Sequence, residues 1–250
     1  MKGMSTYIWR ITSLSLLLSF FSYSALATNP KEEKEQSENG KKTLYGIYVD
    51  YDLGDLLLNA IESQRFGMNA SVELDLMHFI YPAFEVGFES YDSAPDYSYN
   101  NTSGEDKSSG VKYDVDGMYY KVGANLNLLA KDYSKPLTPY AYVGARYAIA
   151  PNYKYEISGF STNSSYWPGQ ELLERQKGNT TAQWAEFIAG VSTPIYKGLC
   201  LGVEIRFKQF LYIESVDEGD FTIHQSYVPG YGDKDDGLWS FRYTISYFFR

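Results

Sequence analysis

Eight segments of this chain alternate between apolar and polar residues, and this alternation constrains the fold more than any other feature. In the stretch GLCLGVEIRF, residues 198–207, every second side chain is apolar, and those between are small or charged. A period of two is typical of a β-strand with one apolar and one polar face. The alternating segments are 44–52, 66–77, 83–90, 115–129, 138–150, 181–193, 199–213 and 238–249. Several reach the roughly 9–11 residues of a tilted membrane-crossing strand, and their even number favours an antiparallel β-barrel.

The connections between these segments alternate in length. Those at 78–82, 130–137 and 194–198 have the length and the composition of turns. The other four are much longer and rich in Tyr, Ser, Asn, Gly and Asp, at roughly 53–65, 91–114, 151–180 and 214–237. Short turns at one end and long loops at the other are typical of outer-membrane barrels.

Soluble lipocalin-like barrels and membrane barrels share the alternation but invert it, because the first enclose the apolar face and the second expose it to lipid. On the polar face of this chain, charges of both signs recur among glycines such as Gly87, Gly144 and Gly202. Glycine weakens a water-exposed strand, whereas a narrow eight-stranded lumen needs small neighbours beside long charged side chains. Because buried charges must be paired, we predict a lumenal ion-pair network. Its members are Glu73, Asp75, Glu85, Glu89, Lys121, Arg146, Glu186, Glu204, Arg206 and Arg242.

The sequence therefore predicts an all-β fold, an eight-stranded antiparallel up-and-down transmembrane β-barrel with its apolar face toward lipid. Aromatic residues gather near the margins of that face, and we predict that they form an aromatic girdle. The girdle residues are Tyr45, Tyr51, Tyr147, Trp239, Tyr247 and Phe249. A soluble lipocalin-like periplasmic or secreted carrier, with the two faces reversed, stays the alternative.

The first 27 residues have the layout of a secretory signal peptide. Lys2 and Arg10 precede a short apolar stretch, and Ala25 and Ala27 occupy the small-residue positions of a cleavage site. We predict cleavage after Ala27, a flexible charged linker over 28–42 and the barrel over 43–250.

Charge and cysteine content argue against a nucleic-acid partner and against an internal disulfide. Without the leader, 20 Lys and Arg stand against 31 Asp and Glu, a net charge of −11 that argues against nucleic acid as a partner. Cys200 is the single cysteine, so an internal disulfide is excluded. The acidic stretch at 233–237 lacks the spacing of a calcium loop, and we expect neither a metal nor a cofactor.

The C-terminal sequence FRYTISYFFR resembles the terminal strand by which outer-membrane proteins are recognised for insertion, with Phe249 as the closing aromatic and Arg250 after it. The resemblance implies the barrel-assembly machinery as a partner. The architecture resembles the small OmpA-type eight-stranded barrels. The stretch YVPGYGDKDDGLWSFRYTISYFF is similar to an uncharacterised outer-membrane barrel family of Bacteroidota, in which a PGYG turn, here residues 229–232, precedes the last strand. This likeness covers 43–250 and implies the outer membrane of a Gram-negative bacterium, without an activity.

Two features suggest alternatives to a purely structural role. His224 and Ser226 form a His-x-Ser pair that resembles that of outer-membrane lipid A deacylases, although Tyr227 follows where those enzymes have Asn. The segment LGDLLLNAIE at 53–62 has leucines at helical spacing. Such a helix either packs over the barrel mouth or dips into the membrane surface.

We therefore expect a monomeric integral outer-membrane barrel, not an enzyme, with a charge-filled, non-conducting lumen. Its long extracellular loops are structural or bind a ligand that the sequence does not identify. A lipid A-modifying hydrolase that uses His224 and Ser226 is the enzymatic alternative.

Overall fold

The computed structural model describes residues 43–61, 64–92, 96–100, 107–129, 139–162, 170–214, 227–233 and 238–250. The predicted signal peptide with Ala25 and Ala27, the predicted linker, and His224 and Ser226 lie outside these residues. The elements are β1 (Leu44–Asp52), α2 (Leu53–Ile61), β2 (Arg65–Leu76), β3 (Ile80–Asp92), β4 (Asp96–Asn100), β5 (Lys107–Asn127), β6 (Tyr140–Thr162), β7 (Gln170–Tyr196), β8 (Leu199–Ile213), β9 (Tyr227–Val228), β10 (Gly232–Asp233) and β11 (Trp239–Phe249).

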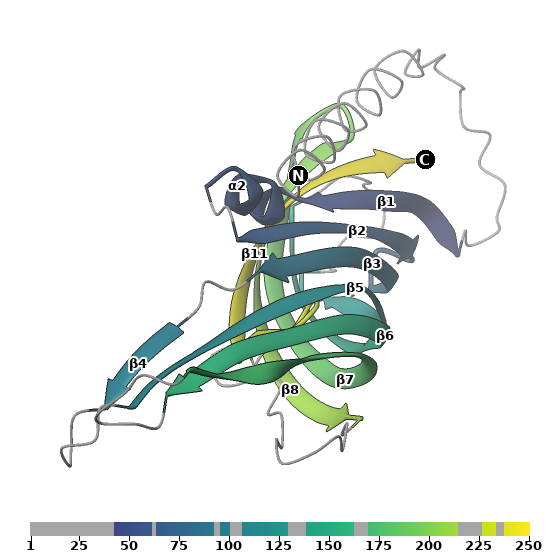
Figure 1. Cartoon of the computed structure of the whole chain (residues 1–250). Helices are drawn as coiled ribbons and strands as arrows, with labels where there is room; N and C mark the ends of the chain where they lie inside the picture. The colour runs from purple at the N-terminus through teal and green to yellow at the C-terminus, as the bar shows by residue number, and fades with distance from the viewer. Residues whose placement is uncertain are drawn as a thin grey trace, which may run out of the picture. The chain divides into compact units, whose positions relative to one another are not determined.

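Eight of the strands form a closed antiparallel barrel (Figure 1). Going round the wall, the order is β1, β2, β3, β5, β6, β7, β8 and β11, and β11 pairs with β1 to close the ring. Each strand except β11 is followed in the ring by the next wall strand along the chain, which is the up-and-down arrangement. The predicted eight-stranded barrel is confirmed.

The alternation places charges inside the barrel and apolar side chains outside. On β8, Val203 is 41% exposed on the outer surface, whereas Glu204 is 3% exposed and points into the lumen. Arg206 and Cys200 also point inward, and Leu201 and Ile205 point outward. The lipocalin-like alternative requires the reverse orientation.

Tight turns join β2 to β3 and β7 to β8 at one end of the barrel. Residues 77–79 connect β2 to β3, and Met77 and His78, at the centre of the turn closed by the Phe79 N–H and the Leu76 carbonyl, have positive φ, at 56° and 54°. Lys197 and Gly198 connect β7 to β8 with φ of 33° and 91°. Positive φ at both central residues is the geometry of the two-residue turns that match the twist of antiparallel strands.

The long connections contain more regular structure than the sequence pattern predicts. The hairpins of β5, β6 and β7 continue well past the predicted segments, and β4 pairs with the extended part of β5. In β6 a bulge between Ala150 and Tyr153, with Asn152 at φ 50°, marks the point where the apolar alternation stops. Backbone pairing continues beyond it, because ladder hydrogen bonds do not depend on whether the side chains are apolar.

Aromatic clusters lie inside the barrel on both sides of the charged residues. Near the tight turns, a lower cluster contains Tyr48, Tyr81, Tyr140, Tyr142, Ile188, Cys200 and Phe248. Toward the long loops, an upper cluster is built around Tyr119, Tyr153, Trp184, Val228 and Tyr231. Gly190 provides the room that the ring of its cross-strand partner Tyr142 needs, since a Cβ there would lie 2.6 Å from the ring.

Within the described part of the chain, no helix is both long enough and apolar enough to cross a membrane.

Candidate functional site

The predicted charges converge in the middle of the lumen because neighbouring strands contribute inward positions at similar heights. Cross-strand register sets Glu85 opposite Lys121, Arg146 opposite Glu186, and Arg242 opposite Glu204. All ten side chains of the predicted network are buried. Register alone therefore brings opposite charges into adjacent positions.

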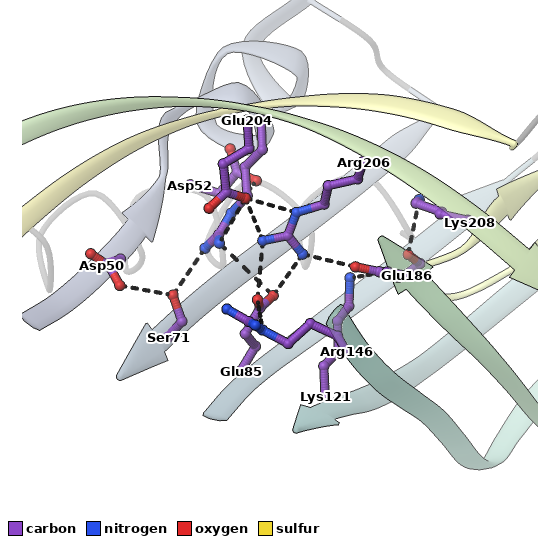
Figure 2. Close-up of polar contacts among 12 residues, drawn as sticks. Asp50, Asp52, Ser71, Glu85, Lys121, Arg146, Glu186, Glu204, Arg206 and Lys208 are labelled. Atoms are coloured by element: carbon purple, nitrogen blue, oxygen red, sulfur yellow. Dashed lines mark hydrogen bonds and ion pairs between the residues drawn. The ribbon is translucent and has the colours of Figure 1, made fainter. Parts of the chain in front are cut away.

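Arg206 lies at the centre of this network (Figure 2). Its Nη1 donates to Glu85 Oε2 and to Glu186 Oε2, each at 2.9 Å. Its Nε donates to Glu204 Oε2 at 2.8 Å, and Nη2 donates to Glu85 Oε1 at 3.0 Å. One guanidinium thus joins three carboxylates from three strands through charge-assisted hydrogen bonds, which are stronger than neutral ones.

The remaining cations of the network extend it around the wall. Arg146 donates to Glu85 at 3.1 Å and lies 3.3 Å from Glu73, and Lys121 Nζ donates to Glu186 at 2.7 Å. Arg242 lies 3.1 Å from Asp52. Among the buried side-chain nitrogens and oxygens of the described residues, those without a hydrogen-bond partner are Asn69 Oδ1, His78 Nε2 and Asn125 Oδ1. None of these atoms belongs to a carboxylate, a lysine or an arginine, so the desolvated charges are compensated.

Two predicted members of the network lie away from its centre. Asp75 binds His78 at the tight-turn end, accepting from the backbone N–H at 2.8 Å, with Oδ2 2.5 Å from Nδ1. Glu89 lies toward the long-loop end, where it forms an ion pair with Arg65.

The predicted network leaves out several charged residues of the lumen, among them Asp52, Lys208 and Arg65. Asp52 follows Asp50 at the next inward position of β1, and Lys208 follows Glu204 and Arg206 at the next inward position of β8. The period-two pattern could therefore have found both. Arg65 begins β2, one residue before the predicted segment, and no sequence signal marked it as the partner of Glu89.

A hairpin between β8 and β11 fills the long-loop end of the lumen. We call residues 227–233, which contain β9, β10 and the turn of sequence PGYG, the PGYG hairpin. Val228 and Tyr231 are buried, and the ring of Tyr231 packs edge-on against Trp184 and Phe210, with centroids 5.9 Å and 5.2 Å away. Gly230 has φ 79°, and its position leaves room for the ring of Tyr119.

Two lumenal charges fix this hairpin. Glu89 accepts from the Tyr227 hydroxyl at 2.5 Å and from the Gly230 N–H at 2.6 Å. Lys208 Nζ donates to the carbonyls of Gly230 and Tyr231, at 3.2 Å and 2.7 Å. Burial, and then the nearby Glu89 carboxylate, raise the pKa of Tyr227. Its hydroxyl therefore stays protonated and keeps donating to Glu89.

The outer surface of the wall strands forms what we call the outer belt. It consists of every second residue over 45–51, 68–76, 80–88, 118–126, 141–149, 185–195, 199–207 and 239–249. None of these outward residues carries a charge. Phe84 is half exposed, and Val122 and Phe187 are more than half exposed. The first outward charges of β5, β6 and β7 lie beyond the belt, at Asp116, Lys154 and Lys177.

The predicted girdle residues lie near the margins of the outer belt. Tyr45, Tyr247 and Phe249 are at the tight-turn end, and the last two rings are 4.7 Å apart. Tyr51 and Trp239 lie toward the long-loop end, where Trp239 packs on Phe207 at 5.0 Å. The Tyr147 hydroxyl donates to Gln183 at 2.7 Å on the outer surface, so its ring lies at the edge between apolar and polar residues.

A family model described as a domain of unknown function, DUF6048, matches residues 7–249. The chain belongs to this family. No curated protein matches the chain. Among the described residues, no group of three or more His, Cys, Asp or Glu side chains lies close enough together to hold a metal ion.

Proposed function

We propose that this protein is an integral outer-membrane β-barrel of a Gram-negative bacterium, with a charge-filled lumen that does not conduct. The observation that carries the proposal is the inversion of polarity between the two faces of the wall. The outer belt has no charged side chain, whereas the lumen holds carboxylates, guanidiniums and ammonium groups.

An outer belt in water would be unfavourable. Soluble monomers rarely expose apolar patches beyond a few hundred Å², and here apolar side chains surround the barrel on all eight wall strands. In a bilayer the same belt faces acyl chains, and the strands satisfy their backbone hydrogen bonds with one another. The belt is also bounded by aromatic residues, as in membrane barrels.

The filled lumen supports a non-conducting barrel. An eight-stranded barrel has an interior just wide enough for side chains. Here the lower aromatic cluster, the ion-pair network, the upper aromatic cluster and the PGYG hairpin succeed one another along it. The extended hairpins of β4 to β7 continue beyond the belt at the long-loop end and provide surface for a structural or ligand-binding role outside the cell.

Membrane fractionation with a heat-modifiability gel tests the location. We expect the protein in the outer-membrane fraction, detergent-soluble, monomeric, and migrating differently on the gel before and after boiling. Recovery of the folded, mature protein in the aqueous fraction without detergent would contradict the proposal. In planar bilayers we expect no stable conductance, and a large stable conductance would exclude the filled lumen.

The hydrolase alternative is tested separately. If His224→Ala and Ser226→Ala leave the acylation of lipid A in cells unchanged, while both variants reach the outer membrane, the enzymatic role is excluded.

A further inference from the structure

The wall of the barrel is interrupted on one side. β1 ends at Asp52, which pairs with Thr244 of β11, and its last pair with β2 joins Tyr51 to Ala70. Both neighbours continue past this point, β2 over 65–69 and β11 over 239–243, without a strand between them. Helix α2 follows β1 directly and lies beside the ends of these strands (Figure 1).

The helix is bound to the edge of β2 as a strand would be. The Asn59 side-chain amide donates from Nδ2 to the Gly67 carbonyl at 2.6 Å and accepts from the Gly67 N–H at 2.7 Å. This amide therefore makes the two hydrogen bonds that a paired strand residue would exchange with Gly67. One helical turn earlier, Asp55 forms an ion pair with Arg65 at 3.2 Å.

Asp52 links the helix to the lumen. Its Oδ1 accepts from the backbone N–H of Gly54 at 2.7 Å, as an N-cap residue does. Its Oδ2 accepts from Arg242 Nε at 3.1 Å. The start of α2 is thus fixed to the ion-pair network by one carboxylate.

Like the wall strands, α2 has its polar side chains on the buried side and apolar side chains on the exposed side. Asp55 and Asn59, four residues apart, are buried on the inner side, whereas Leu57 is 58% exposed and Leu53 and Leu56 are half-buried. A helix that covers a soluble protein buries its apolar stripe and exposes its polar one. On β2, Gly67 is the partner of Asn59, and the next residue, Met68, belongs to the outer belt and pairs with the outward Phe88. Helix α2 therefore lies directly beside the outer belt.

We infer that α2 is part of the lipid-facing wall and that the leucines around Leu57 contact the acyl chains of the outer leaflet. This inference rests on the proposed function, since the belt it continues is the proposed membrane surface. It assigns α2 to the wall of the barrel rather than to a lid over its mouth.

A spin-label experiment tests the contact. Leu57→Cys is labelled, reconstituted in phosphatidylcholine vesicles, and probed with molecular oxygen, which concentrates in the bilayer, and with a water-soluble nickel chelate. The parent protein, whose Cys200 is buried, serves as the unlabelled blank. Val203→Cys on the outer belt and Lys177→Cys beyond it are the matched references for lipid and water.

We expect the label at Leu57 to give an oxygen-to-nickel accessibility ratio close to that at Val203 and several-fold above that at Lys177. A ratio close to that of Lys177 would overturn the inference, because the helix would then lie in water. Low accessibility to both reagents would also overturn it, since another part of the chain or a second copy would then cover the leucines. In either case a lipid-like ratio at Val203 leaves the proposed membrane location intact. A water-like ratio at Val203 contradicts both the membrane location and the lipid contact of α2.

Discussion

At the scale of single residues, the central charged side chains of the lumen contact several oppositely charged partners rather than one. Arg206 contacts Glu85, Glu186 and Glu204, and Glu85 also contacts Arg146. Transfer of such charges out of water costs several kcal/mol per ion in proteins unless partners and hydrogen bonds compensate them. Each side chain of this network therefore depends on several others.

Arg206→Met is expected to lower the free energy of unfolding by about 3–5 kcal/mol, because three buried carboxylates lose their common partner. Lys177→Met is the matched control, since its ion pair with Glu156 at 3.1 Å is exposed and such pairs contribute at most about 1 kcal/mol. Urea titration of the protein refolded in vesicles measures both values. Equal losses for the two variants would contradict a central role for Arg206.

Val203→Arg tests the outer belt at its middle. We expect a loss of about 2–4 kcal/mol in vesicles, because the new charge would lie near the bilayer midplane, whereas Gln209→Arg near the long-loop margin of the same strand should cost about 0–1 kcal/mol. The same titration compares the two variants. If Val203→Arg costs no more than Gln209→Arg, the belt is not in hydrocarbon.

At the scale of elements, the alternating pattern predicted the strands that lie along the belt and failed where the belt ends. β1 and β8 have the predicted bounds, 44–52 and 199–213, because apolar residues alternate along nearly their whole length. β5, β6 and β7 extend further than predicted at the long-loop end, because outward polar and charged residues such as Lys154 and Lys177 replace the apolar pattern there while the backbone ladder continues. Side-chain periodicity reports the environment of a strand and not its length.

The helix and the hairpin show a second limit of the sequence. Leucine spacing indicated a helix near α2, but its place in the wall depends on the contact between Asn59 and Gly67, which no local pattern encodes. The two-residue strands β9 and β10 are too short to show any period, although the PGYG turn between them was visible.

Asn59→Ala is expected to loosen α2 from the wall. It leaves the Gly67 N–H and carbonyl without their partner, and an unsatisfied buried polar group costs about 1–3 kcal/mol. Leu57→Ala, on the opposite side of the same helix, removes no hydrogen bond and serves as control. Hydrogen exchange at the Gly67 amide should accelerate in Asn59→Ala only, and unchanged exchange would show that the side chain does not protect this edge of β2.

At the scale of the whole molecule, the interior is closed in layers, and the PGYG hairpin is the outermost one. The hairpin is fixed by Glu89 and Lys208, which belong to the wall, and its Tyr231 packs on Trp184 in the upper aromatic cluster. Because the wall carries its own ladder of backbone bonds, we expect the hairpin to open without unfolding the barrel.

Lys208→Met is expected to release the hairpin without unfolding the wall. The variant loses the donors to the Gly230 and Tyr231 carbonyls, so chymotrypsin should cleave after Tyr231 faster than in the parent protein, while heat-modifiability is retained. Mass spectrometry of the fragments identifies the cleavage site, and Lys177→Met is the control. Protection of Tyr231 equal to that in the parent protein would show that Lys208 does not fix the hairpin.

The position of Glu85 between three arginines has an evolutionary consequence. Arg146, Arg206 and Arg242 approach its oxygens at 3.1 Å, 2.9 Å and 3.8 Å from three different strands. A substitution that removes the charge of any one of these four residues leaves buried charge of the opposite sign without a partner, and the other three residues cannot compensate it. Across DUF6048 sequences, these positions should therefore covary as a quartet, while the residues of the outer belt drift independently among apolar types.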